Sequence, residues 1–205
     1  MNGTRERLLD EAELLFARAG IAAVTTREIV EAAEQRNASA VTYHFGSREG
    51  LLQAILARRG APIDERRGEL REAAGDHPTL RDLVASLVVP YVAQLDSASG
   101  RSYVRIVDQL RGRFAAWRVE SDAETAKQLA RILDEIERRP AAAPAVRHAR
   151  VVALIMVMTG TVADRARTID GGDEPELDRD AFVENLIEMC AAVIGAVATG
   201  GPSQD

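Results

Sequence analysis

The chain has 205 residues, of which 46% are hydrophobic, 28% charged and 4% aromatic. This composition is ordinary for one large or two small globular domains, with a core built mostly from aliphatic side chains. The net charge of −6 argues against a protein that coats nucleic acid non-specifically, and the single cysteine, Cys190, excludes an internal disulfide.

No sustained strand-like alternation of apolar and polar residues occurs, so we expect an all-α protein of about nine helices. The longest apolar run, 151–160, is too short to span a bilayer, and acidic residues interrupt the apolar stretch at the N-terminus. We therefore expect a cytoplasmic protein without a membrane segment.

The first helix is predicted over residues 4–19, because apolar residues recur there at helical spacing. Gly20 follows where a left-handed C-terminal cap belongs. The inward face is expected to comprise Leu8, Ala12, Leu15, Phe16 and Ala19.

Two short helices follow. Thr25 and Glu28 form a capping box that starts the second helix, with Ile29, Ala32 and Ala33 facing inward. Asn37 is the expected N-cap of a third helix over 38–44, which Gly46 ends. Two short helices joined by a tight turn indicate a helix-turn-helix unit that reads DNA. Phe45, Leu15, Phe16 and Ile29 are expected to form its core.

Helices continue through the rest of the chain. Ser47 caps a fourth helix that extends to about residue 74, with a kink or break at Pro62. Thr79 and Asp82 start a fifth helix, a turn is expected at 97–100, and a sixth helix covers 101–110. Ser121 and Glu124 form a further capping box, and the helix that they start ends before Pro140.

Two long helices, predicted at 145–168 and 178–199, end the ordered chain. Both carry heptad-like apolar stripes as well as apolar residues off the stripe, and a helix that is apolar on two sides is covered on two sides. We expect a second copy of the chain to cover one side, although burial within one larger bundle remains the alternative. The expected homodimer interface comprises Val151, Ile155, Met158, Val162, Phe182, Leu186, Met189 and Val193.

The sequence resembles the TetR/AcrR family of bacterial repressors over about residues 5–56. The resemblance rests on Thr25–Ile29, the run Tyr43-His44-Phe45-Gly46-Ser47-Arg48-Glu49 and the pair Leu51-Leu52. It implies a dimeric repressor with three N-terminal helices that bind a palindromic double-stranded operator. It also implies a ligand cavity in the remaining helices, and Tyr43 and His44 that grip phosphates.

A recognition helix inserts its N-terminal residues into the major groove. Here these are small and mostly neutral, so Ser39 and Thr42 are expected to hydrogen-bond and Ala40 to touch a thymine methyl. Arg27 and Arg36 are expected to add the stronger contacts, and Arg48 to add charge at a helix N-terminus. The expected DNA-binding residues are Thr25, Thr26, Arg27, Arg36, Asn37, Ser39, Ala40, Thr42, Tyr43, His44 and Arg48.

The second half of the chain is expected to hold a small, largely apolar effector between helices. Aromatic and methionine side chains at helical spacing are the candidates, although each can equally be a core residue. The expected ligand contacts are Tyr91, Tyr103, Arg105, Phe114, Trp117, Met156 and Met158. No metal or cofactor is expected, because His44, His77 and His148 lie far apart in the sequence without a ligand pattern.

We predict a helix-turn-helix domain at 1–48, a helical ligand-binding and dimerisation domain at 49–199, and a disordered tail at 200–205. An enzyme is disfavoured because no phosphate-binding glycine loop, HExxH motif or nucleophile set occurs. Two alternatives stay open: a helical scaffold that does not bind DNA, and a regulator controlled by a protein partner without a small ligand. Residues 1–50 carry six arginines against eight acidic residues, which favours the scaffold.

Overall fold

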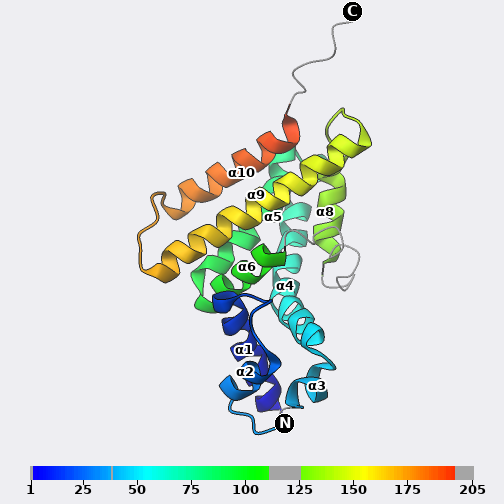
Figure 1. Ribbon diagram of the computed structural model, residues 1–205. Coiled ribbons are helices and arrows are strands. Elements are labelled where there is room, and N and C mark those ends of the chain that lie inside the picture. Colours follow the sequence, from blue (N-terminus) through cyan, green and yellow to red (C-terminus); the bar gives the residue numbers. More distant parts are fainter. Residues whose placement is uncertain (1, 38, 111–125, 197–205) are drawn as a thin grey trace, which may run out of the picture.

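The structure, a computed structural model, describes residues 2–37, 39–110 and 126–196. Within these ranges the chain forms nine α-helices and one 3-10 helix and contains no strand, as the sequence predicts. Three helices, α1 to α3, form a head at one end, and α9 and α10 cross the other end (Figure 1). The 26-residue helix α4 joins the two parts.

The head comprises α1 (Asn2–Ala19), α2 (Thr26–Ala32) and α3 (Ala40–Phe45). Its core has the predicted centre, because Leu8, Phe16 and Ile29 are fully buried. The sequence places too many residues inward, however: Ala19 and Ala32 are exposed and Phe45 is half-buried. The third helix also begins two residues later than predicted. Asn37 accepts a hydrogen bond from the Ser39 backbone N–H at 2.9 Å, in a turn that precedes the helix.

Helix α4 (Arg48–Ala73) starts where predicted, because the Ser47 hydroxyl accepts from the Gly50 N–H at 2.9 Å. It is not split at Pro62, which lies inside one continuous helix. Its first turns bury Leu51 and Ile55 in the head, and further along Ile63 packs in the second core. One rigid element thus contributes to both cores.

The body contains α5 (Leu80–Val92), the 3-10 helix η1 (Ala93–Asp96), α6 (Ala98–Leu110), α8 (Lys127–Glu137), α9 (Pro144–Gly171) and α10 (Arg179–Gly195). Thr79 and Asp82 form the predicted capping box of α5. Residues 98–100 are helical rather than a turn, because the Ser97 hydroxyl accepts from the Gly100 N–H and thereby starts α6. The predicted capping box at Ser121 and Glu124 and the predicted tail at 200–205 lie outside the described residues.

The apolar stripes of α9 and α10 mostly face the core of the chain and not the solvent. Six of the eight residues expected at the dimer interface lie in the core of the single chain, between α9, α10 and the helices beneath them, which corrects that prediction. They are Val151, Ile155, Met158, Val162, Phe182 and Leu186. Met189 and Val193 are half-buried at the edge of this core. The heptad spacing located an apolar face correctly but could not say what covers it.

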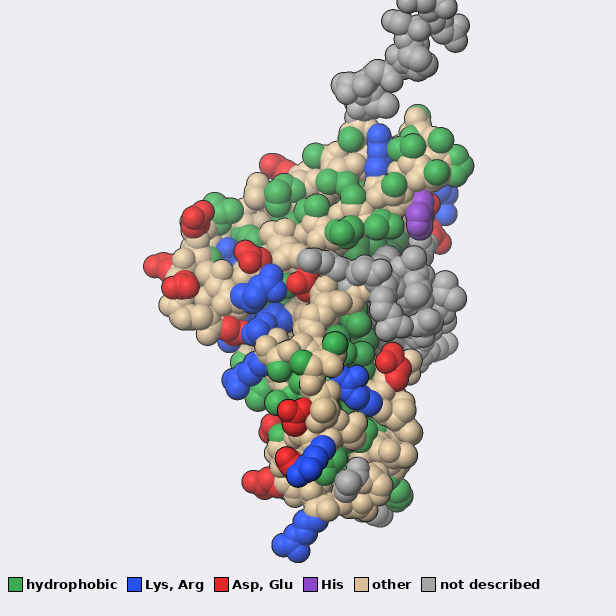
Figure 2. Space-filling model, viewed as in Figure 1, with side chains coloured by type: hydrophobic (Ala, Val, Ile, Leu, Met, Phe, Trp, Pro, Cys, Tyr) green, Lys and Arg blue, Asp and Glu red, His purple; other side chains and the backbone are tan. Residues whose placement is uncertain are grey.

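A second face of α9 and α10 remains open to solvent, and Figure 2 shows hydrophobic side chains gathered over these two helices. On α9 the exposed Met156 shares this face with the small residues Ala149, Ala153 and Gly160, at steps of four and three. On α10 the exposed residues include Asn185 and Ala192. Within the described residues, a long surface of mostly small and apolar side chains on α9 and α10 therefore has no other helix packed against it.

Among the described residues, α9 alone is long and apolar enough to cross a membrane by length and composition. The core helix of a globular protein passes the same test. Helix α9 packs against α6, α8 and α10, and Leu154 and Val162 on it are fully buried. Burial within the chain therefore accounts for the apolar composition of α9.

Candidate DNA-binding surface and internal cavity

The start of α2 is held by a closed set of hydrogen bonds. The Thr25 hydroxyl accepts from the Glu28 N–H at 3.2 Å, and the Glu28 carboxylate accepts from the Thr25 backbone N–H and hydroxyl, each at 2.7 Å. These bonds, the backbone one first, lower the pKa of Glu28, so this carboxylate is charged at neutral pH. Thr25 is accordingly engaged as a helix cap, and its side chain has no free donor for a phosphate.

The outer surface of α3 presents polar and aromatic groups. Tyr43 is 77% exposed, the largest exposure of any large hydrophobic side chain that is described. Its ring contacts that of the half-buried His44 edge to face, with 4.9 Å between ring centroids. Ser39 and Thr42 are also exposed. An exposed tyrosine combines an apolar ring with a polar hydroxyl and therefore suits contact with a partner.

Two further arginines extend the exposed surface of the head. Arg27 on α2 donates from Nε to Glu31 at 2.7 Å, and its side chain is 86% exposed. Arg36 and Asn37 lie exposed in the turn between α2 and α3. Thr26 is half-buried in the first turn of α2. Solvent screens an ion pair as exposed as Arg27–Glu31, so a stronger partner can displace Glu31 at little cost.

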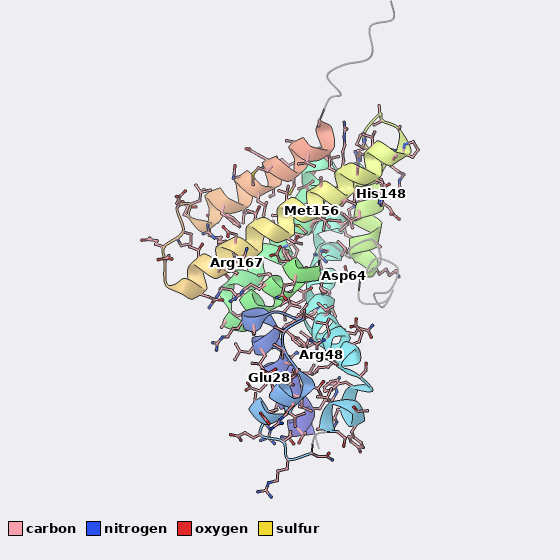
Figure 3. All side chains as sticks on the ribbon, viewed as in Figure 1. Glu28, Arg48, Asp64, His148, Met156 and Arg167 are labelled. Atoms are coloured by element: carbon pink, nitrogen blue, oxygen red, sulfur yellow. The ribbon has the colours of Figure 1, made fainter. Side chains whose placement is uncertain are left out.

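Two predicted contacts are corrected by the structure. Ala40 is 7% exposed and packs in the head core, so its methyl group is turned away from any groove. Arg48 is engaged inside the chain: its Nε donates to the Val24 carbonyl at 3.1 Å, a second nitrogen donates to the Ile21 carbonyl, and the guanidinium lies 5.1 Å from the Phe16 ring centroid. Arg48 therefore fixes the loop before α2 rather than offering a free charge (Figure 3).

A small cavity of about 50 Å³ lies between α4, α5, α6, α8 and α9. Three residues expected from the sequence, Tyr91, Tyr103 and Met158, are among those that line it. The described lining comprises Leu56, Arg67, Tyr91, Tyr103, Val107, Leu110, Leu129, Ile155, Met158 and Thr159. Burial raises the pKa of both tyrosines, so their phenols are neutral.

The other predicted ligand contacts lie elsewhere. Arg105 pairs with Asp170 at 3.2 Å and lines a separate cavity of about 470 Å³ between α1, α4 and α6, so its predicted ligand contact stays a prediction. Met156 is 48% exposed on the outer face of α9 (Figure 3). The Met156 prediction is therefore corrected, because helical spacing alone did not distinguish the inner face of α9 from the outer one. Phe114 and Trp117 lie outside the described residues.

Sequence reasoning missed the most polar group of the cavity, Arg67. This residue is 7% exposed, and its Nε is buried without a hydrogen-bond partner. Arg67 follows Ile63 by one helical turn on α4, so the buried face could have been read from that spacing. A mid-helix arginine in a charged segment is usually solvated, and this expectation concealed it.

Polar contacts connect the head to the body. The Gln109 amide on α6 donates to the Phe16 carbonyl at 2.9 Å and accepts from the Ile21 N–H at 2.7 Å. These two hydrogen bonds fix the C-terminal end of α1 to α6. Glu13, which is 2% exposed, accepts hydrogen bonds from Arg58 and Arg59 of α4. The head is thus fixed to α4 and α6, two of the helices that line the cavity.

No cluster of three or more His, Cys, Asp or Glu suited to a metal ion occurs in the part of the chain that the structure describes. Burial raises the pKa of the Cys190 thiol to about 12, which keeps it protonated and unreactive at neutral pH.

Comparison with known families gives two matches. Residues 8–55 match the family of bacterial regulatory proteins of the tetR type, and residues 85–193 match the tetracyclin repressor-like C-terminal domain. The first match covers α1 to α3 and the start of α4, and the second extends from α5 to α10.

Two curated relatives match parts of the chain. The HTH-type transcriptional repressor KstR2 of Rhodococcus jostii is 34% identical over 97 residues, which are 47% of this chain and 46% of the relative. The HTH-type transcriptional regulator YvkB of Bacillus subtilis is 34% identical over 74 residues, 34% of this chain and 39% of the relative. The matched segments therefore span less than half the length of each relative.

Solved structures share the whole fold. The fatty acid degradation regulator FadR from Bacillus halodurans has a TM-score of 0.59 at 14% identity, covering 96% of this chain and 97% of its own. SmeT, the repressor of the Stenotrophomonas maltophilia efflux pump SmeDEF, has a TM-score of 0.55 at 19% identity, covering 97% and 96%. At these identities the likeness concerns the fold alone.

Proposed function

This chain belongs to the TetR family of bacterial regulatory proteins and is a DNA-binding transcriptional regulator rather than an enzyme; on that premise we propose that it is a cytoplasmic, dimeric repressor released from a palindromic operator by a small, largely apolar effector. In this proposal residues 1–48 read DNA, and residues 49–199 dimerise and bind the effector. Repression is supported by KstR2, a relative that matches over less than half of its length and is named a repressor.

The observation that carries the DNA contact is the exposed surface of α3 with Tyr43 at its centre. We expect α3 to enter the major groove, with Ser39 and Thr42 at base edges or phosphates and Tyr43 and His44 at phosphates. In the free protein the Ser39 hydroxyl donates a hydrogen bond to Asn37 Oδ1 at 2.6 Å. Because this bond is exposed, the hydroxyl can readily donate to an acceptor on DNA instead. Thr26 and Arg36 flank the same surface.

Arg27 is the strongest candidate for reading a base. A bidentate arginine–guanine contact discriminates by about 1–3 kcal/mol, more than the exposed Arg27–Glu31 pair contributes. Acidic residues are interspersed with arginines over the head (Figure 2). We therefore expect few phosphate contacts and a shallow dependence of affinity on salt concentration.

A second copy of the chain is the expected partner of the open face of α9 and α10. Small residues such as Ala149, Ala153 and Gly160 allow two helices to approach closely, and Met156 supplies apolar area at the centre. Met189 and Val193 at the edge of the body core extend this face. Two copies related by a two-fold axis would place two heads on one palindrome.

Effector release requires a ligand that binds one arrangement of the heads more tightly than the other. The cavity beside α4 is the proposed effector site, with Tyr91, Tyr103 and Met158 among its walls. Control by a protein partner remains the second candidate, because the cavity of about 50 Å³ is far smaller than the roughly 300–1,000 Å³ of typical ligand pockets. Binding of an effector in this cavity therefore requires the surrounding helices to separate.

The test of DNA binding begins with selection from a random duplex pool at moderate salt, followed by affinity measurement on the selected duplex. We expect a palindrome, and about a tenfold loss of affinity for Arg27→Ala and for Tyr43→Ala. Arg66→Ala is the matched control, since Arg66 is also an exposed arginine in a helical ion pair, with Glu69. Absence of enrichment even at low salt would support the scaffold alternative.

The dimer is tested separately by sedimentation. Met156→Glu places a charge at the centre of the open face and is expected to yield monomers. Leu177→Glu is the control, because Leu177 is similarly exposed, at 41% against 48%, but lies in the loop between α9 and α10. A Met156→Glu protein that remains dimeric would show that the interface lies elsewhere.

A further inference from the structure

We infer that the effector carries one anionic group, such as a carboxylate or sulfonate, on an apolar body, and that Arg67 binds this group in the cavity beneath α9. The inference rests on the proposed function, because it names the ligand class of the proposed effector cavity.

Arg67 is a cation whose charge is incompletely matched by the residues that the structure describes. It is 7% exposed and its Nε has no hydrogen-bond partner. Its nearest described carboxylate is that of Asp64, whose Oδ1 lies 3.8 Å from Nη1, beyond hydrogen-bonding distance. Arg67 thus retains donors that a ligand can use.

Asp64 is itself engaged by another helix (Figure 3). Its two carboxylate oxygens accept from the backbone N–H groups of Gln128 and Leu129, each at 2.8 Å, at the start of α8. This carboxylate therefore holds an N-terminus whose dipole already attracts negative charge. Its position is fixed by α8, and it is not free to move toward Arg67.

A buried guanidinium without full pairing is costly, and burial lowers the pKa of Arg67. Replacement by an apolar residue would relieve this cost, so the arginine is poorly explained as a stabilising feature. A planar guanidinium with free donors matches a carboxylate or sulfonate, which offers two oxygens side by side. The missing acceptor is thus of the kind that an anionic ligand brings.

The remaining cavity wall favours an apolar body for the ligand. Among the described lining residues Arg67 is the only charged one, and none is acidic. The Thr159 hydroxyl donates to the Ile155 carbonyl at 2.8 Å, and the Tyr91 hydroxyl faces the Val104 carbonyl at 3.5 Å. These polar groups have partners inside the chain, and the rest of the wall is aliphatic or aromatic. One negative charge with an apolar remainder fits this arrangement.

Binding at Arg67 acts on the helix that reaches the head. Helix α4 carries Arg67 and also Leu51 and Ile55 of the head core, and Pro62 between them lacks the N–H of a normal helical residue. A cavity of about 50 Å³ holds a few water molecules at most, so a larger ligand must displace a surrounding helix. An anion paired with Arg67 moves or restrains α4, which links occupancy to the head.

The experiment uses two fluorescent probes that differ by one group. Anilinonaphthalene sulfonate is an anion, and N-phenylnaphthylamine is nearly the same apolar body without the sulfonate. Each is titrated into the full-length protein, and affinity is taken from the rise in fluorescence. We expect the sulfonate probe to bind at least about tenfold more tightly than the neutral probe, because only the sulfonate can accept a charged hydrogen bond from Arg67.

Arg67→Met should remove this preference and leave the affinity of the neutral probe unchanged. The control is Arg66→Met, the exposed neighbour on the same helix, which should retain the preference. If Arg67→Met loses its helical circular dichroism, Arg67→Lys replaces it, with weaker sulfonate binding expected because the fork of donors is lost. Equal binding of both probes, absence of binding, or a preference that survives substitution of Arg67 overturns the inference.

Operator binding of the same proteins is measured in parallel. If the wild-type protein does not bind DNA, the proposed repressor function is refuted, but the probe result does not change. A probe preference that is independent of Arg67 refutes the anionic effector but does not change the DNA result.

Discussion

The half-buried Arg48 in the head and the buried Arg67 in the body differ in how fully the chain satisfies their hydrogen bonds. Arg48 at the base of the head donates to two backbone carbonyls and lies over the Phe16 ring. Arg67 in the body has a buried Nε without a partner and a carboxylate at 3.8 Å that α8 already occupies. A satisfied cation fixes local structure, whereas an unsatisfied one indicates a site whose remaining partner comes from outside the chain.

The same contrast extends to the two cores. The head core is small and its residues support an exposed surface, on which Tyr43 and Arg27 stand free of the packing. The body core is larger and encloses its proposed site between five helices. Reading DNA requires side chains on the outside, whereas the proposed sensing of a small molecule requires an interior, so the proposal assigns the two tasks to opposite ends of α4.

The largest expected effect tests how far the head depends on its few core residues. Phe16→Ala removes a fully buried ring and should lower the free energy of unfolding by about 3–5 kcal/mol, with loss of DNA binding. Phe45→Ala should cost less, because Phe45 is half-buried and its ring faces Arg5 at 5.1 Å. Urea unfolding followed by circular dichroism measures both. An equal loss for the two variants would show that Phe45 belongs to the core after all.

A second prediction sets the two arginines against each other. Arg48→Met should lower the free energy of unfolding by about 1–3 kcal/mol, because the Val24 and Ile21 carbonyls lose their donor. Arg67→Met should be neutral or stabilising, because it removes a poorly paired buried charge. The measurement is urea unfolding of both proteins without ligand. A large destabilisation by Arg67→Met would mean that Arg67 is a structural residue like Arg48.

Local signals in the sequence were sufficient for most of the fold. The capping boxes of Thr25 with Glu28 and Thr79 with Asp82 were predicted, because a cap depends on residues three apart and on nothing distant. The cap of α3 was misplaced, since Asn37 makes its hydrogen bond in a turn that precedes the helix. Helix boundaries without a closed cap are therefore the less predictable ones.

Tertiary relationships were less accessible. The sequence assigns the stripes that begin at Val151 and Phe182 to a partner subunit, yet the chain's own helices cover both. Periodicity identifies a face but does not say which neighbour covers it. The same limit explains Met156, assigned to the cavity although it lies outside, and Arg67, omitted although it lies inside. The structure had to supply the pairing of faces.

The smallest expected effect concerns pH and uses a feature that head and body share. Hydrogen bonds from Thr25 lower the pKa of Glu28 from its ordinary 4.5, and those from Thr79, the hydroxyl first, lower that of Asp82 from its ordinary 3.8. A carboxyl whose pKa is lower in the folded protein stabilises it above the unfolded pKa. This contribution disappears as the pH falls through the folded value.

Glu28→Gln and Asp82→Asn should therefore each flatten the decline of Tm in acid by a small amount, since both carboxylates are exposed and screened. Thr25→Ala should flatten the same part of the curve by less than Glu28→Gln, because it removes the hydroxyl donor to the Glu28 carboxylate while the backbone N–H of residue 25 still donates. Thermal unfolding followed between about pH 7 and pH 2.5 provides the comparison. Because head and body carry equivalent boxes, equal flattening by the two carboxyl substitutions would indicate that both parts unfold together. An effect confined to Asp82→Asn would indicate that the head unfolds first in acid, independently of the body.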